Sequence, residues 1–182
     1  MARVYLSLGS NLGDRLGLLK AAVLGLRRSA GVRFIGASAL YEAEPWESEP
    51  GHFANQRVWY LNCAVAIETT LSPIDLLDRL QQIETGLGRE RGAGTPETAR
   101  YAARTLDIDI LFYEDRVISV PDRLQVPHLL LHERAFVLQP LAELAPDIEH
   151  PTLYRTIREL LAELADEHVV RRAEHPVRWF ED

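Results

Sequence analysis

Two aspartates lie two residues apart in a run that otherwise has the pattern of a buried strand. In TLDIDILF, alternation places Ile108, Ile110 and Phe112 on one face of an extended chain, and Asp107 and Asp109 on the other. Two residues of strand span about 7 Å, so both carboxylates reach the same hard cations and their phosphate oxygens. A solvated sheet face explains the pattern equally well, because antiparallel sheets often expose one side to water.

Arginines cluster just before this strand and favour the metal interpretation. Guanidinium groups beside carboxylates suit a magnesium–nucleotide, because arginine binds the phosphates while aspartate binds the metal. The run Gly92–Thr98 between the arginines is small and polar, and it predicts a flexible lid over the site. The arginines concerned are Arg89, Arg91, Arg100 and Arg104.

The elements that must position these residues follow from hydrophobic periodicity. Residues Arg3–Leu8 alternate as a strand, Gly9 begins a turn, and Asp14 is a suitable cap for the next helix. The other elements expected before the aspartates are strands over Val32–Glu42 and Val58–Thr69 and a helix that Ser72 caps.

The order strand, helix, two strands, helix, strand is that of a ferredoxin-like sandwich. We therefore expect an α+β fold: an antiparallel sheet with helices packed on it, followed by C-terminal helical additions. Pro140 predicts a broken or two-part helix over Glu133–Leu144. Leu153–Leu164 has the apolar stripe of a last helix, and Val169–Arg172 predicts an edge strand.

Two further elements carry side chains suited to a flat heterocycle. In the third strand Tyr60 and Asn62 point the same way, which sets an aromatic plane beside an amide. Trp46 lies in a stretch without periodicity and serves either packing or one wall of a ligand site. A solvated face and ordinary packing explain these three residues nearly as well.

Composition limits the classes of function. The chain has 182 residues, enough for one domain over 1–182, and its 47% hydrophobic content is typical of a soluble globular protein. A net charge of −7 disfavours nucleic acid as a partner, although an arginine cluster can still hold one nucleotide. The single Cys63 excludes an internal disulfide framework. With no signal-peptide pattern and no membrane-length apolar run, we expect cytoplasmic residence without membrane contact. A monomer is also expected.

Five segments follow one another along the chain: YLSLGSNLGDR, YLN, IETGLGRER, RYAARTLDIDIL and VPHLLLHERAFVLQPLAELAP. In this order they resemble the 6-hydroxymethyl-7,8-dihydropterin pyrophosphokinases of folate biosynthesis, and the resemblance covers nearly the whole sequence. It implies that the terminal diphosphate of ATP is transferred to the hydroxymethyl group of a dihydropterin, giving AMP and the pterin diphosphate. It also implies two magnesium ions, which the motif assigns to Asp107 and Asp109.

The resemblance assigns roles to other residues as well. It implies that the pterin stacks between Tyr60 and Phe136, with the Asn62 amide at its hydrogen-bonding edge and with Trp46 and Tyr101 as further substrate-binding residues. Catalytic positive charge is expected from Arg91, Arg100 and Arg104. The residues expected to contact ATP are Gln81, Glu84, Arg89, Arg104, Arg123 and His128.

The chain departs from the family pattern at several places around the predicted site. Tyr101-Ala102-Ala103 stands where the family commonly has tryptophan and Gly-Pro, and Leu129 replaces the usual proline or tyrosine after His128. The loops Glu47–Trp59 and Gly92–Arg100 are longer than is usual. Lid closure and substrate affinity are therefore not transferred from the family.

Two alternatives remain open at this point. Ferredoxin-like sheets also serve as RNA platforms, so a non-catalytic binding module is one. Its exposed aromatics and basic face are poorly matched by the negative net charge and the aspartate pair. The other is a family relative with an altered substrate, which Tyr101 and the long loops permit.

Overall fold

The main sheet is built around β1 and β4, two long strands that pair along their whole length in the computed structural model. The sheet order is β5-β1-β4-β3-β8, with β2 pairing to β4 beyond β3, and every pairing is antiparallel. The structure describes residues 1–46, 59–88, 105–176 and 178–181. The strands are β1 Ala2–Ser10, β2 Val32–Ala37, β3 Tyr41–Ala43, β4 Tyr60–Thr69, β5 Asp107–Tyr113 and β8 Val170–Arg172.

Strands β2 and β3 lie one after the other along the same edge of β4, so they act as one interrupted strand. Helix α1 (Arg15–Arg28) follows β1, and α2 (Pro73–Gly86) follows β4. The resulting order β5, β1, β4, β2/β3 is the ferredoxin-like arrangement, and the predicted α+β fold is confirmed. After β5 the chain forms a separate hairpin of β6 (Ile118–Val120) and β7 (Leu124–Val126).

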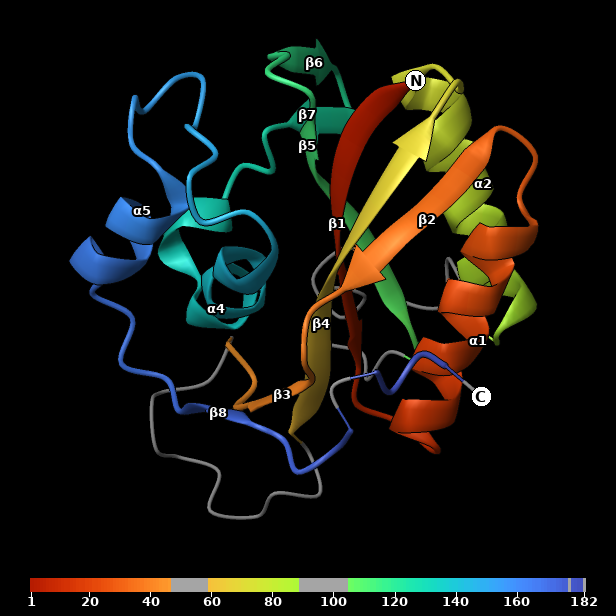
Figure 1. The fold of residues 1–182 in the computed structure, drawn as a ribbon, viewed down its shortest axis with the longest axis horizontal. Helices are drawn as coiled ribbons and strands as arrows, with labels where there is room; N and C mark the ends of the chain where they lie inside the picture. The colour runs from red at the N-terminus through yellow and green to blue at the C-terminus, as the bar shows by residue number, and fades with distance from the viewer. Residues whose placement is uncertain (47–58, 89–104, 177, 182) are drawn as a thin grey trace.

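Helices cover both faces of the sheet. Figure 1 shows α1 and α2 on one side, and α4 (Ala135–Leu144) with α5 (Ile157–Glu163) on the other. A large apolar core lies under α1 and α2 and includes Leu8, Cys63 and Ile108. A second, smaller core lies under α4 and α5. Among the helices of the described ranges, none combines the length and apolar character that crossing a bilayer requires.

Local capping fixes where the helices begin. The Asp14 carboxylate accepts a hydrogen bond from the Gly17 amide at 2.9 Å, and the Ser72 hydroxyl accepts one from the Asp75 amide at 3.2 Å, so both predicted caps are confirmed. The last helix was predicted to begin at Leu153, but it begins at Ile157, because Thr156 and Glu159 form a reciprocal capping box there.

The prediction of one continuous strand over Val32–Glu42 is wrong, because the chain leaves the sheet at Ser38. There the Ser38 hydroxyl donates to the Ala39 carbonyl at 2.7 Å and accepts from the Ala64 amide at 3.0 Å. The Ser38 carbonyl accepts the indole N–H of Trp179 at 2.8 Å. These side-chain bonds replace the regular ladder and separate β2 from β3.

The prediction that Pro140 breaks its helix is also wrong. A short 3₁₀ turn, η2 (Leu131–Glu133), precedes α4, and α4 then continues through Pro140 to Leu144. A proline removes one backbone hydrogen bond from a helix. Pro140 is itself buried, however, and lies among the side chains of α4 that form the second core. Tertiary packing therefore outweighs the local helix-breaking tendency.

Regular alternation was predicted along the whole of β5, but the strand departs from it near its end. Its register with β1 shifts between Tyr5 and Leu6, where Tyr5 pairs with Phe112 and Leu6 with Ile110. This bulge leaves Leu111 as an extra residue and turns Phe112 into the second core, away from Ile108 and Ile110. The face that carries Asp107 and Asp109 thus becomes apolar beyond the bulge.

Candidate active site

A single cross-strand row joins the predicted metal and pterin residues. Gly9 of β1 pairs with Asp107 of β5 on one side and with Asn62 of β4 on the other. Directly paired residues of an antiparallel sheet project to the same face, so Asp107 and Asn62 flank the glycine on one surface. Asn62 also pairs with Tyr41 of β3, which extends the row to the next strand.

Gly9 was predicted to begin a turn, but it lies inside β1, which continues through Ser10. A Cβ atom at this position would lie 2.7 Å from the Asn62 Oδ1 atom and 3.9 Å from Cδ1 of Tyr60. Any side chain here would collide with Asn62, so the glycine leaves the space that the Asn62 amide occupies over β1. A glycine within an alternating strand is the sequence signal that would have indicated this role.

Asn62 is only 2% exposed, yet its side-chain nitrogen has no hydrogen-bond partner among the described residues. A buried amide without a partner is unfavourable unless a ligand completes it. Tyr60 lies two residues before Asn62 on β4 and projects to the same face. The arrangement of an aromatic ring beside a hydrogen-bonding amide, expected from the sequence, is thus present.

Asp109 lies two residues beyond Asp107 on β5. It pairs with Ser7 of β1, which in turn pairs with Ala64 of β4. Both aspartates are partly exposed, whereas Ile108 between them is buried in the first core. The described residues contain no group of three or more histidine, cysteine, aspartate or glutamate side chains arranged to hold a metal. Two carboxylates on one face nevertheless fit magnesium, which binds one or two carboxylates together with substrate phosphates.

Glu84 of α2, one of the expected ATP contacts, is buried. Its carboxylate accepts the Ile108 amide at 2.8 Å. This bond satisfies a backbone donor at the outer edge of β5, between the two aspartates in sequence. Helix α2 therefore fixes the position of the aspartate strand.

His128 lies close enough to Asp107 and Arg134 for both charges to influence it. Burial, reinforced by the Arg134 guanidinium, lowers the pKa of His128 from 6.5 to about 4, although the Asp107 carboxylate acts in the opposite direction. The imidazole is therefore neutral at physiological pH. Its Nδ1 atom accepts the Leu130 amide at 3.3 Å, which leaves Nε2 as the protonated donor.

Arg134 was not selected from the sequence, but it brings several predicted residues together. Its guanidinium carbon lies 4.6 Å from the Trp46 ring centroid and 5.6 Å from that of Phe136. The same charge also contributes to the lowered pKa of His128. The available signal was its place in the motif, two residues before Phe136.

The remaining predicted ATP contacts of the described chain lie around α2. Gln81 is half-buried one turn before Glu84, and Arg123 follows β6 and forms an ion pair with Asp78 of α2. The hairpin and the helix are thus joined beside the edge of β5. The predicted residues Arg89, Arg91, Arg100, Tyr101 and Arg104 lie outside the described residues.

Comparison with known proteins assigns the chain to a family. A family model described as 7,8-dihydro-6-hydroxymethylpterin-pyrophosphokinase (HPPK) matches residues 5–146, which include every described residue of the site. The chain belongs to this family.

Individual relatives agree with the HPPK assignment. The chain is 43% identical over 164 residues to the 2-amino-4-hydroxy-6-hydroxymethyldihydropteridine pyrophosphokinase of Methylorubrum extorquens, covering 90% of this chain and 94% of that one. It is 40% identical to the protein of the same name from Pseudomonas aeruginosa, covering 93% and 96%. The two proteins are therefore similar to this HPPK chain over almost their full lengths.

Solved structures support the fold independently of sequence. A wild-type HPPK-DHPS of Plasmodium falciparum matches with a TM-score of 0.66 at 17% identity, covering 89% of this chain and 41% of that one. An HPPK-DHPS in complex with substrates matches with a TM-score of 0.64 at 14% identity, covering 88% and 44%. The chain thus spans about two fifths of these longer proteins.

Proposed function

We propose that this HPPK chain transfers diphosphate from ATP to 6-hydroxymethyl-7,8-dihydropterin, giving AMP and the pterin diphosphate in folate biosynthesis. The observation that carries the proposal is the row Asp107–Gly9–Asn62, which places a carboxylate strand and a buried amide with an unsatisfied nitrogen on one face of the sheet. The carboxylate end of the row suits phosphate chemistry, and the amide end suits pterin recognition. The binding-module alternative offers no explanation for a carboxylate pair beside that amide.

The pterin end of the row recognises a flat ring. We assign ring stacking to Tyr60 and Phe136, and hydrogen bonding at the ring edge to Asn62, whose side-chain nitrogen otherwise stays buried without a partner. Trp46 and Arg134 close the same region, since the guanidinium lies against the rings of both Trp46 and Phe136.

The phosphate end holds the nucleotide. We assign two magnesium ions to Asp107 and Asp109, where they would neutralise charge on the phosphate oxygens. Neutral His128 presents its Nε2–H as a donor for ATP, and Gln81, Glu84 and Arg123 surround the same edge. We assign the catalytic positive charge to Arg91, Arg100 and Arg104, with Arg89 on ATP and Tyr101 on the pterin.

In the reaction, the hydroxymethyl oxygen of the pterin attacks the β-phosphorus of ATP. The new bond joins this oxygen to the β-phosphorus, and the hydroxyl proton is lost to solvent. The bond from the β-phosphorus to the oxygen bridging it to the α-phosphate breaks, and AMP leaves with that oxygen. The chain contributes mainly by placing the two substrates in line, because positioning and electrostatics dominate phosphoryl transfer. We expect no strong general base.

The test is AMP formation from ATP and the hydroxymethyl dihydropterin with magnesium, followed by chromatography of the nucleotides. AMP and pterin diphosphate should appear in equal amounts, and chelation of magnesium should stop the reaction. If neither product forms, the proposal is wrong. Pterin binding without turnover, in the presence of an unreactive ATP analogue, would instead indicate a relative with an altered substrate.

A further inference from the structure

Helix α4, which carries Phe136, is capped by a residue far along the chain. The helix begins at Ala135, and its N-cap residue Arg134 makes no capping hydrogen bond with its own side chain. Instead, the Asp166 carboxylate oxygen Oδ2 accepts the Ala135 amide at 2.8 Å, across 31 positions of sequence. A carboxylate at a helix N-terminus satisfies an otherwise free amide and interacts favourably with the helix dipole.

The other oxygen of Asp166 binds His168. Oδ1 accepts the His168 amide at 3.0 Å and lies 2.6 Å from Nδ1 of its ring. Burial opposes ionisation of Asp166, but the hydrogen bonds from Ala135 and His168 outweigh it and hold its pKa below the usual value. The side chains of Asp166 and His168 are 3% and 11% exposed, so both are nearly buried.

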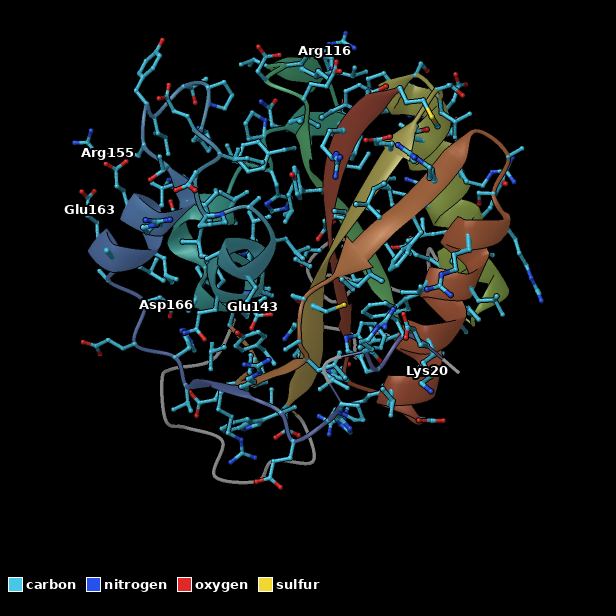
Figure 2. The ribbon with its side chains drawn as sticks, in the orientation of Figure 1. Lys20, Arg116, Glu143, Arg155, Glu163 and Asp166 are labelled. Carbon is cyan, nitrogen blue, oxygen red and sulfur yellow. The ribbon has the colours of Figure 1, made fainter. Side chains whose placement is uncertain are left out.

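His168 connects this pair to the segment that carries Trp46. The two rings lie 6.3 Å apart between centroids and are tilted by 32°. The next residue, Val169, donates its amide to Oε2 of Glu44 at 3.0 Å and accepts the Glu44 amide at 3.1 Å. Figure 2 shows Asp166 on the segment between α5 and β8, on the α4 side of the molecule.

Asp166 and His168 contact two segments that contribute to the site, namely the start of α4 and the segment that carries Trp46. Ala135 lies between Arg134 and Phe136, and the Arg134 guanidinium bridges the rings of Phe136 and Trp46. Trp46, Asp166 and His168 are among the residues that line a cleft of ≈ 630 Å³, whose other lining residues come from η2, α5 and the segment that follows α5. We propose that Asp166 and His168 are positioning residues for pterin binding, which hold the Arg134–Phe136 segment at a fixed place relative to Trp46; this inference rests on the proposed function.

The test compares Asp166→Ala with Thr156→Ala. Each variant removes the side-chain cap of one helix. The Thr156 hydroxyl caps α5 and forms its hydrogen bonds with Glu159, whose amide it accepts at 3.3 Å. The dissociation constant of the dihydropterin is measured by fluorescence titration with an unreactive ATP analogue present. Asp166→Ala should raise it on the order of tenfold, and Thr156→Ala should leave it within about twofold.

His168→Phe provides a milder variant, which matters if Asp166→Ala does not fold. It keeps a ring against Trp46 but removes the contact with Oδ1 of Asp166, and it should raise the pterin dissociation constant about threefold. Normal binding by the wild type with unchanged binding by the folded variants overturns the positioning role alone. Absence of pterin binding by the wild type overturns the proposed function, and the positioning role with it.

Discussion

Two neighbouring rows of the same three strands have opposite character. The row Leu8–Cys63–Ile108 is fully apolar and lies under α1 and α2, whereas the row Gly9–Asn62–Asp107, one residue along each strand, forms the polar surface of the site. Because alternate residues project to opposite faces, one set of strands performs two tasks. The first row stabilises the fold, and this leaves the second available for ligands.

The polar face is itself divided along the strands. Asp109 still faces outward, but beyond the bulge in β5 the same surface becomes the second core, with Leu111 and Phe112 under α4 and α5. Helix α4 therefore ends the polar region and brings Phe136 and Arg134 to its border. The comparison predicts that substitutions on the polar row change activity, whereas substitutions on the apolar row change stability.

The largest effect is expected for the carboxylates. Asp107→Ala and Asp109→Ala should each lower kcat on the order of a thousandfold or more, because they remove charge stabilisation made mainly in the transition state. Their free energy of unfolding should change by less than about 1 kcal/mol, since both side chains are partly exposed. Steady-state kinetics and urea unfolding measure the two quantities, and wild-type kcat in either variant would refute the metal assignment.

The apolar row should show the reverse. Ile108→Ala removes a buried side chain from the first core and should lower the free energy of unfolding by about 2 to 5 kcal/mol. At a temperature where the variant stays folded, its kcat should remain within about tenfold of the wild type. A loss of kcat as large as that of the aspartate variants would break the division between the two rows.

The next effect concerns the pH dependence of stability. The pKa of His128 falls from 6.5 to about 4 on folding, so the native state binds fewer protons between these values. The contribution of neutral His128 to the free energy of unfolding is present above pH 6.5 and is lost as the pH falls toward 4. Between pH 7 and pH 5 the loss should be on the order of 2 kcal/mol.

His128→Asn should remove most of this slope, which urea midpoints at pH 7 and pH 5 would reveal. Part of the slope will remain, because burial, together with the nearby His132, also lowers the pKa of His150. An equally steep loss in the variant and the wild type would mean that His128 is not held neutral by its surroundings.

The smallest change is a single methyl group on the polar row. Gly9→Ala places a Cβ 2.7 Å from Oδ1 of Asn62, so the amide must move, and KM for the dihydropterin should rise about tenfold. Gly36→Ala in β2 is the matched control, because its Cβ would meet no atom within 4 Å. If both variants keep the wild-type KM, the placement of the Asn62 amide over Gly9 has no role in pterin binding.

The sequence alone determined what depends on neighbours in the chain. Alternation placed Asp107 beside Asp109 and Tyr60 beside Asn62, and Asp14 and Ser72 marked the helix starts, because these features are set within a few residues. The order of elements then predicted the ferredoxin-like fold. The family resemblance, carried by the motifs, supplied the reaction.

Only the tertiary structure decided how distant segments meet. The register across three strands put Gly9 between Asn62 and Asp107, and a bulge moved Phe112 to the second core. The long-range cap from Asp166 fixed the start of α4, although no local pattern links the two. Strand register and helix docking follow from burial summed over the whole core, so a local pattern read from the sequence does not contain them.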